Sequence, residues 1–352
     1  MNELTAGMRP DEILSATLRA LYVTYGYRIY KVNRFEAYDL YVQNKNFLRD
    51  ERILTFTDLN GHLKALKPDI TLSVVRNTRD ERLPVRVCYS ESAYRVPKGE
   101  DGFHEIMQTG IEYIGPCDGA VLAEVILLAE KSLRSISPNY ALDISHMGLV
   151  SQLLQTCRVP EDEFPQVLEM IRRKDRHGMQ AYAKGRGLDA HEETILDLLI
   201  ILSGPIRPAL ARLMDCDLPA GAKAVIRELN SILDIVESVW QGHLNLDFSG
   251  LSDMRYYNGL TLSGFIDGVP APILSGGQYD PLLEKLGRSG QGIGFAVYLN
   301  EIERSILKTT EVEPKRIHTG DDPKKAFIQA EQMRESGPVV LMPGEKAGED
   351  LC

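Results

Sequence analysis

The segment from Tyr94 to Gly115 constrains the fold of this chain more than any other. It reads Tyr-Arg-Val-Pro-Lys-Gly-Glu-Asp-Gly-Phe-His-Glu-Ile-Met-Gln-Thr-Gly-Ile-Glu-Tyr-Ile-Gly. A turn-rich polar loop separates two segments typical of strands, which predicts an antiparallel hairpin. Side chains two positions apart share one face of a strand, so Gln108 and Glu112 should point the same way, with Gly110 leaving a gap between them.

This hairpin admits two interpretations. An amide and a carboxylate over a glycine gap, with Arg95 across the hairpin, could together hold a small zwitterion. A hairpin with one polar, solvated face is the simpler interpretation, and the segment taken alone favours it.

The order of the remaining segments predicts an α+β fold. Strand and hairpin patterns dominate residues 1–155 and return in 243–310, which we expect to form the two parts of one core. Helical periodicity dominates 156–242, which predicts a helical insertion. Residues 311–352 indicate a charged linker, one helix and one strand, too little to close a core of their own. We therefore expect an antiparallel sheet flanked by helices.

Two local expectations concern the second part of the core. The run Gly276-Gly277-Gln278-Tyr279-Asp280 predicts a glycine-rich turn. The apolar run from Gly292 to Val297 is predicted to enter a final long helix.

Composition limits the class of protein. A formal net charge of -10 over 352 residues is unfavourable for binding a polyanion such as tRNA. No Cys-x-x-Cys pair occurs among the five scattered cysteines, which favours reduced thiols over disulfides or a zinc site: Cys88, Cys117, Cys157, Cys216 and Cys352. The first residues hold no apolar signal, and no apolar run is long enough to span a bilayer. We expect a soluble cytoplasmic protein without metal or cofactor.

Five short motifs, in this order, resemble those of histidyl-tRNA synthetases. They are Leu66-Lys67-Pro68-Asp69-Ile70-Thr71, then Tyr94-Arg95 with Glu105-x-x-Gln108-x-Gly110-x-Glu112, then Tyr256-Tyr257-Asn258-Gly259, Gly276-Gly277-Gln278-Tyr279-Asp280 and Gly292-Ile293-Gly294-Phe295-Ala296. Each motif alone is weakly specific, but their shared order over about the first 300 residues is specific. The resemblance implies the fold of class II aminoacyl-tRNA synthetases.

The same resemblance implies a pocket for histidine. Arg95 would bind the ligand carboxylate through two hydrogen bonds. The α-ammonium or the ring would meet Gln108 and Glu112, and the imidazole would meet Tyr256 and Tyr257. The complete expected set is Asp69, Thr71, Arg95, Gln108, Glu112, Tyr256, Tyr257 and Tyr279. Asp69 replaces a glutamate and reaches one methylene less far. The alternative is an inherited polar scaffold that binds nothing.

The positions that would form an adenylate depart from the synthetase pattern. Pro97 or its neighbours stand where a glutamate reads the adenine, and Ser252 stands at an arginine position. Asn300-Glu301 replaces the arginine that ends the third motif. Because adenylate formation needs positive charge beside the phosphates, these departures argue against catalysis. The anticodon-binding domain is expected to be reduced to the tail after Lys324.

A synthetase-like chain with a histidine pocket and without the ATP residues resembles the regulatory subunits of ATP phosphoribosyltransferase. The segments from Met170 to Asp175 and from Leu202 to Gly204 also resemble that family. The resemblance implies a non-catalytic chain of histidine biosynthesis, a homodimer within a hetero-oligomer. It would bind the short catalytic subunit, support its activity and mediate feedback by histidine. Two alternatives stay open: an active histidyl-tRNA synthetase or amino-acid-activating paralogue, and an interaction scaffold without a ligand.

Overall fold

The computed structural model describes residues 8–44, 52–78, 84–96, 102–250, 256–305, 315–319, 322–334 and 338–343. The chain divides into two compact units, Met1–Leu307 and Lys308–Cys352. The first unit holds the sheet that positions the candidate site, and the second is described by itself.

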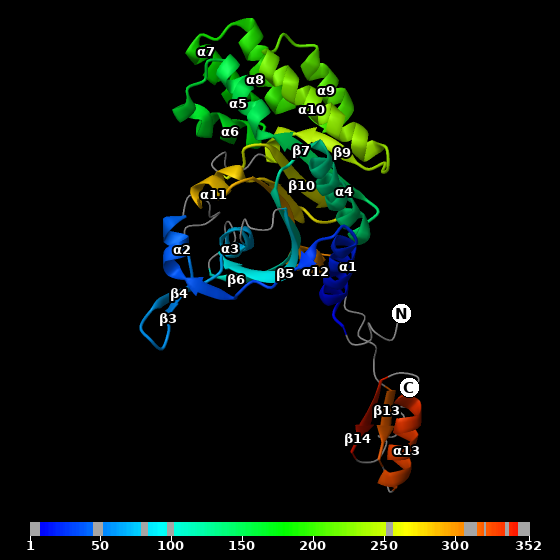
Figure 1. Cartoon of the computed structure of the whole chain (residues 1–352). Coiled ribbons are helices and arrows are strands. Elements are labelled where there is room, and N and C mark those ends of the chain that lie inside the picture. The colour runs from blue at the N-terminus through cyan, green and yellow to red at the C-terminus, as the bar shows by residue number, and fades with distance from the viewer. Residues whose placement is uncertain are drawn as a thin grey trace. The chain divides into compact units, whose positions relative to one another are not determined.

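A mixed sheet forms the centre of the first unit (Figure 1). Within the described residues it has nine strands, in the spatial order β1-β5-β6-β12-β11-β10-β7-β9-β8. Their bounds are β1 (Arg28–Ile29), β5 (Val85–Arg95), β6 (His104–Gly115), β7 (Tyr140–His146), β8 (Ser203–Pro205), β9 (Leu244–Asp247), β10 (Leu260–Ile266), β11 (Leu274–Gln278) and β12 (Gln291–Tyr298). Neighbours are antiparallel except β1 with β5 and β7 with β9. The predicted α+β class, with a largely antiparallel sheet flanked by helices, is confirmed.

The predicted hairpin is the pair β5–β6, in which Arg95 lies opposite His104 and Tyr89 lies opposite Gly110. Residues directly opposite each other share a face, so Arg95, Gln108 and Glu112 lie on one face, as predicted. Gly110 is required there, because a Cβ atom at this position would lie 2.8 Å from the Tyr89 hydroxyl.

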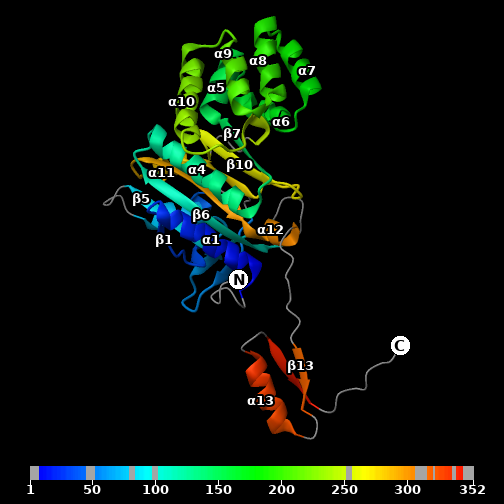
Figure 2. The same cartoon turned by 90° about the vertical axis from the view of Figure 1, so that its right-hand side faces the viewer.

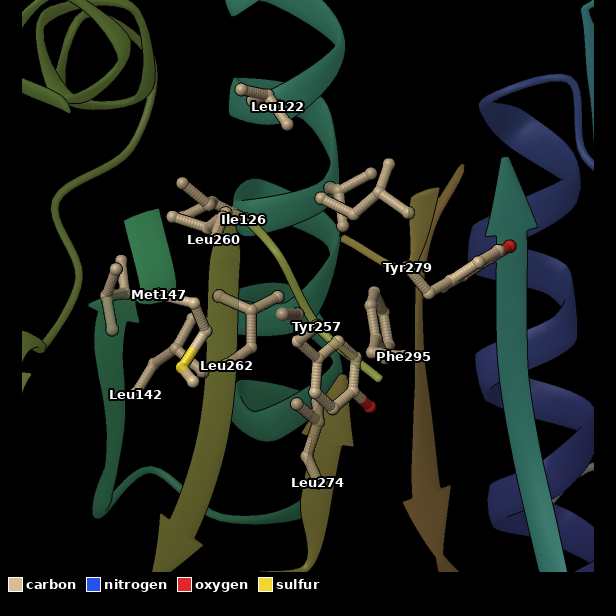
Figure 3. Close-up of a cluster of buried hydrophobic side chains, with 14 of the residues drawn as sticks. Leu122, Ile126, Leu142, Met147, Tyr257, Leu260, Leu262, Leu274, Tyr279 and Phe295 are labelled. Carbon is tan, nitrogen blue, oxygen red and sulfur yellow. The ribbon is translucent and has the colours of Figure 1, made fainter. Parts of the chain in front are cut away.

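Helices cover both faces of the sheet. Figure 2 shows α1 (Pro10–Thr24) and α4 (Gly119–Ile136) over one face. Asp118 caps α4 by accepting hydrogen bonds from the backbone of Ala120 and Val121, which fixes where the helix starts. In Figure 3, Leu122 and Ile126 of α4 pack near Leu260 and Leu262 of the sheet in one buried apolar cluster. The opposite face carries α3 (Ile70–Asn77) and α11 (Asp280–Lys285).

A small sheet lies beside α3. Its order is β2-β4-β3, with bounds β2 (Phe35–Ala37), β3 (Thr55–Thr57) and β4 (Leu63–Leu66), and α2 (Tyr38–Gln43) follows β2. Strand β4 ends at Leu66, and a short connection through Lys67, Pro68 and Asp69 leads to the start of α3 at Ile70.

The segment with helical periodicity forms a block of helices beside the β7 end of the sheet (Figure 1). The bounds are α5 (Met147–Thr156), α6 (Phe164–Arg172), α7 (Arg176–Arg186), α8 (Ala190–Ile201), α9 (Ile206–Met214) and α10 (Ala220–Glu237). Strand β8 lies between α8 and α9 and pairs with β9 at the sheet edge. Lys174, in the turn before α7, donates a hydrogen bond to Asp247 of β9 at 2.8 Å, which connects the block to the sheet.

Two local predictions were wrong. Gly276 and Gly277 lie in strand β11 and not in a turn. Glycine is needed there because the neighbouring chain comes very close. A Cβ atom on Gly276 would lie 2.6 Å from the Cα atom of Phe295 in the neighbouring strand. The run from Gly292 to Val297 is strand β12, and helix α12 (Leu299–Ser305) begins only after it.

The second unit contains β13 (Lys315–His318), α13 (Pro323–Arg334) and β14 (Val339–Met342). The two strands pair in parallel. Helix α13 and strand β14 were predicted, whereas Lys315–His318 was predicted to be linker. Its single apolar residue, Ile317, packs with Ala326, Ala330 and Val339 in a small core. Across the described residues of both units, no helix is long and apolar enough to cross a membrane.

Candidate ligand-binding site

All eight residues predicted for the histidine pocket line one cavity on the α3 face of the sheet. The start of α3 supplies Asp69 and Thr71, and the hairpin β5–β6 supplies Arg95, Gln108 and Glu112. The remaining members, Tyr256, Tyr257 and Tyr279, come from the segments before β10 and after β11. Segments separated by up to about 200 residues in the chain therefore meet in one place.

Glu112 lies at the floor of this cavity and is 1% exposed. Its Oε1 atom accepts hydrogen bonds from the hydroxyls of Thr71 at 2.7 Å and Tyr89 at 3.4 Å. Its Oε2 atom and the nearby hydroxyl of Tyr279 have no partner in hydrogen-bonding geometry within the described structure. The carboxyl group thus keeps an acceptor that no described side chain or backbone group uses.

Burial raises the pKa of Glu112 to about 8. The neighbouring carboxylate of Asp69 raises this pKa further, while the hydroxyls of Tyr279, Thr71 and Tyr89 lower it in part. Since the pKa exceeds neutral pH, the unliganded pocket holds an uncharged acid. A cation placed beside it would favour loss of the proton.

Arg95 supplies the opposite charge. Its side chain is half-buried and forms no ion pair with any residue that the structure describes. Gln108 is 4% exposed and lies between Arg95 and Glu112 along the hairpin face. A guanidinium, an amide and a buried acid in one cavity complement the carboxylate and the ammonium of an amino acid.

Aromatic side chains complete the walls. The rings of Tyr256 and Tyr257 meet edge to face, with centroids 4.6 Å apart. Burial raises the pKa values of Tyr89, Tyr256 and Tyr279 well above the usual value, so these hydroxyls stay protonated and can donate hydrogen bonds. Figure 3 shows Tyr257 and Tyr279 beside the apolar cluster of the sheet.

Asp69 has a structural function besides lining the cavity. Its carboxylate caps α3 by accepting a hydrogen bond from the backbone N–H of Leu72 at 2.8 Å. Such caps typically contribute about 1 kcal/mol to stability. The capping of α3 therefore explains why an aspartate, rather than the longer glutamate, suits this position in this chain.

Residues 5–302 match the family model described as Histidyl-tRNA synthetase. The chain belongs to the histidyl-tRNA synthetase family.

The chain is also similar to proteins that are named as regulatory subunits and not as synthetases. A chain from Clostridium kluyveri named ATP phosphoribosyltransferase regulatory subunit is 28% identical, covering 92% of this chain and 86% of the relative. The resemblance expected from the motifs is thereby confirmed.

Solved structures share the fold. One, described as an ATP phosphoribosyltransferase regulatory subunit/histidyl-tRNA synthetase from Bacillus halodurans C, has a TM-score of 0.79 at 24% identity and covers 95% of this chain and 88% of that chain. Another belongs to the ATP phosphoribosyl transferase (HisG:HisZ) complex from Thermotoga maritima, with a TM-score of 0.64 at 18% identity, covering 82% and 97%. The class II synthetase-like fold is confirmed.

Sequence reasoning missed several residues that line the cavity in this member of the histidyl-tRNA synthetase family. Tyr89 lies opposite Gly110, so strand alternation in β5 was a usable signal for it. Tyr298 lies opposite Gln108 on β12, and Ser275 lies on β11. Predicting either residue would have required knowing that β6, β12 and β11 pair. The sequence instead predicted a turn and a helix for the segments that form β11 and β12.

Asn300, one of the two residues that stand where an ATP-binding arginine is expected, has a structural function in this family member. Asn300 accepts a hydrogen bond from the backbone N–H of Met107 at 2.6 Å and donates one to the carbonyl oxygen of Glu105 at 3.4 Å. The other two departures, at Pro97 and Ser252, lie outside the described residues.

The cavity encloses about 30 Å³, enough for ordered water and too little for an amino acid. Binding of an amino acid therefore requires lining side chains to move apart. Across the described residues, no group of three or more His, Cys, Asp or Glu side chains is placed to hold a metal ion.

Proposed function

We propose that this chain is a non-catalytic regulatory subunit of ATP phosphoribosyltransferase in the cytoplasm. It binds the short catalytic subunit, supports its activity and mediates feedback by histidine in histidine biosynthesis. It needs no cofactor, and it acts as a homodimer within a hetero-oligomer. The observation that carries the proposal is the cavity in which Arg95, which has no ion-pair partner among the described residues, occurs together with Glu112, a buried acid whose raised pKa favours its uncharged form.

The chemistry of the cavity supports an amino acid as the ligand. Arg95 would donate hydrogen bonds to the carboxylate, and Glu112 would lose its proton and bind the ammonium, with Gln108 between them. The tyrosines beside these groups would enclose the side chain of the ligand. A planar ring with N–H groups is the side chain that hydroxyl and aromatic walls fit best, which favours histidine.

The absence of catalysis is supported by the end of the third motif. Where the resemblance implies an arginine that stacks on ATP, the Asn300 side chain is engaged with the backbone of β6. Neither the uncharged asparagine nor the carboxylate of the adjacent Glu301 can offset the charge of the phosphates.

Ion pairing in the helical block argues against tRNA as a ligand. Glu169 pairs with both Arg172 and Arg173 at 2.6 and 2.5 Å. Three further cations of this region pair with carboxylates in the same way: Lys174 with Asp247, Arg176 with Asp197 and Arg186 with Glu163. Cations neutralised within the protein contribute little to binding a phosphate backbone.

The partner is inferred from relatives. The name of the Clostridium kluyveri relative and the complex in which the Thermotoga maritima neighbour was solved both point to an ATP phosphoribosyltransferase catalytic chain. Co-purification of this chain with a short catalytic subunit tests the partner, and no complex at micromolar concentrations would contradict it.

Titration calorimetry with histidine tests the ligand. We expect saturable binding that Arg95→Met weakens at least tenfold, because the ligand carboxylate loses its guanidinium. The matched change Arg227→Met, at an exposed position of α10, should leave the affinity unchanged. Equal affinity for the Arg95 variant would refute the assigned pocket.

Pyrophosphate exchange separates this proposal from the alternative, a histidyl-tRNA synthetase or an amino-acid-activating paralogue. We expect no histidine-dependent exchange of pyrophosphate into ATP above background. Robust exchange would instead establish catalysis.

A further inference from the structure

Two side chains outside the cavity hold the segment that carries Tyr256 and Tyr257, which together form the tyrosine wall of the pocket. Gln278 ends β11, and Asp280 begins α11. Neither residue lines the cavity itself. Any effect that they have on a ligand must therefore pass through the residues that they contact.

Gln278 holds the backbone that follows the tyrosine wall. Its Oε1 atom accepts a hydrogen bond from the backbone N–H of Leu260 at 2.7 Å, and its backbone carbonyl accepts one from the N–H of Asn258 at 3.2 Å. The residue between them is a glycine for a steric reason, because a Cβ atom on Gly259 would lie 2.1 Å from the same Oε1 atom. Gln278 is 8% exposed and Leu260 is fully buried, so the contact between them is shielded from water.

Asp280 connects the same segment to a neighbouring strand. Its Oδ2 atom accepts a hydrogen bond from the side-chain amide of Asn258 at 3.0 Å, and its Oδ1 atom accepts one from the backbone N–H of Gly292 at 2.9 Å. Gly292 belongs to β12, which pairs with β6, the strand that carries Gln108 and Glu112. One carboxylate thus ties the tyrosine wall to the sheet beside the polar end of the pocket.

The tyrosine rings pack directly on the backbone of the strands that these residues join. A Cβ atom on Gly277 would lie 2.8 Å from Cδ1 of the Tyr257 ring, and one on Gly292 would lie 2.3 Å from Cε2 of the Tyr279 ring. Tyr257 in turn meets Tyr256 edge to face. Because such close packing leaves no space for independent movement, a shift of the segment 257–260 relative to β11 displaces the rings.

We propose that Gln278 and Asp280 are positioning residues that hold the tyrosine wall in place for the side chain of the bound amino acid. Rings that are already held in place lose little conformational freedom when the ligand enters, so the affinity is higher than for a wall that must first be ordered. The effect concerns the side-chain end of the ligand, because the carboxylate meets Arg95 on the hairpin β5–β6. This inference rests on the proposed function, since it takes histidine as the ligand.

Titration calorimetry on the full chain tests this with two ligands, histidine and L-histidinol, in which a hydroxymethyl group replaces the carboxylate. Gln278→Met removes the acceptor of the Leu260 N–H, whereas Asp280→Ala and, at an exposed position, Asn258→Ala break the hydrogen bond between those two side chains. We expect Gln278→Met and Asp280→Ala to weaken both ligands by about tenfold and Asn258→Ala by about threefold. Arg95→Met should weaken histidine and leave the affinity for histidinol unchanged.

Matched controls separate positioning from general destabilisation. Gln291→Met likewise removes a side-chain acceptor of a backbone N–H, that of Cys117 at 3.2 Å. Asn245→Ala and Asp143→Ala break another Asn–Asp hydrogen bond, at 3.1 Å between β9 and β7. None of these residues lines the cavity, so the controls should lower Tm without weakening either ligand as much as twofold.

A conservative variant provides a rescue. The amide of Asp280→Asn can still accept from the N–H of Gly292 and can donate to Asn258 once the exposed Asn258 amide rotates. Asp280→Asn should therefore retain most of the affinity that Asp280→Ala loses.

Four results would overturn the inference. Histidine affinity within twofold of the unmodified chain for Gln278→Met, Asp280→Ala and Asn258→Ala would show that the tyrosine wall does not depend on these contacts. Equal losses in the controls would reduce the effect to destabilisation, and a loss for histidine without one for histidinol would place it at the carboxylate. Absence of histidine binding by the unmodified chain would contradict the proposed function itself, and this assignment with it.

Discussion

The proposed binding of histidine should depend on pH in a definite direction, because the pocket contains a buried acid. Glu112 must lose its proton to pair with the α-ammonium of the ligand, and its pKa in the unliganded protein is about 8. Binding therefore releases a proton whenever the pH lies below 8. Affinity should rise as the pH rises from 6 to 8.

The size of this change in affinity follows from the fraction of the protein in which Glu112 is ionised. At pH 6 about 1% of Glu112 is ionised, and at pH 8 about half is, which corresponds to a gain of about 50-fold, or about 2.3 kcal/mol. The imidazole of free histidine also titrates near 6.5 and adds a smaller change if the neutral ring is bound. These two contributions have to be separated.

Calorimetric titrations with histidine at pH 6, 7 and 8 make the separation with two variants. Glu112→Gln removes the titrating group, so its affinity should keep only the weak pH dependence of the ligand. Glu105→Gln makes the same change at an exposed position of the same strand and should retain the full dependence. Equal pH dependence in the unmodified chain and in Glu112→Gln would refute the reasoning.

Further predictions concern stability. A raised carboxyl pKa gives stability that is present below the unfolded-state pKa and is lost as the pH rises through the folded value. Glu112→Gln should therefore raise Tm relative to the unmodified chain at pH 9 and not at pH 4, and a constant difference across this range would contradict it. His146 caps α5 through its Nδ1 atom, which accepts from the backbone of Leu149 at 3.2 Å, so His146→Ala should cost about 1 kcal/mol in urea unfolding; no change in the midpoint would refute the cap. Gly110→Ala should destabilise the chain by more than 1 kcal/mol in the same assay, since its Cβ atom would meet the backbone of β12 and the Tyr89 hydroxyl. Unfolding at an unchanged urea concentration would show that the strands adjust without cost.

Local periodicity predicted part of the site correctly. Alternation along one strand was enough to place Gln108 and Glu112 on a common face, and the hairpin brought Arg95 to the same side. The resemblance to synthetases then added the distant members of the cavity. The common face of these side chains depends on one hairpin, and the other cavity residues lie in short motifs. Both can therefore be predicted from the sequence.

Other features depend on how distant strands approach one another. The pair Gly276 and Gly277 gives the local signal of a turn, yet both lie in strand β11. The backbone of β12 leaves no room for a side chain at Gly276, and the Leu260 carbonyl of β10 and the Tyr257 ring leave none at Gly277. The depth of Glu112 likewise depends on Thr71, Tyr89 and Tyr279, which belong to three other segments. The sequence pattern around residue 112 therefore cannot predict how deeply the Glu112 side chain is buried.

The two hydrogen bonds of Asn300 determine what an arginine at this position would cost. Its side chain holds the backbone of β6 at two points, one of them the N–H of Met107 next to Gln108 of the pocket. Placing an arginine at this position would remove both hydrogen bonds, at a typical net cost of about 1 kcal/mol each, before any benefit from ATP could be realised. A single change to arginine at this position is therefore destabilising on its own, whatever it would contribute to binding ATP.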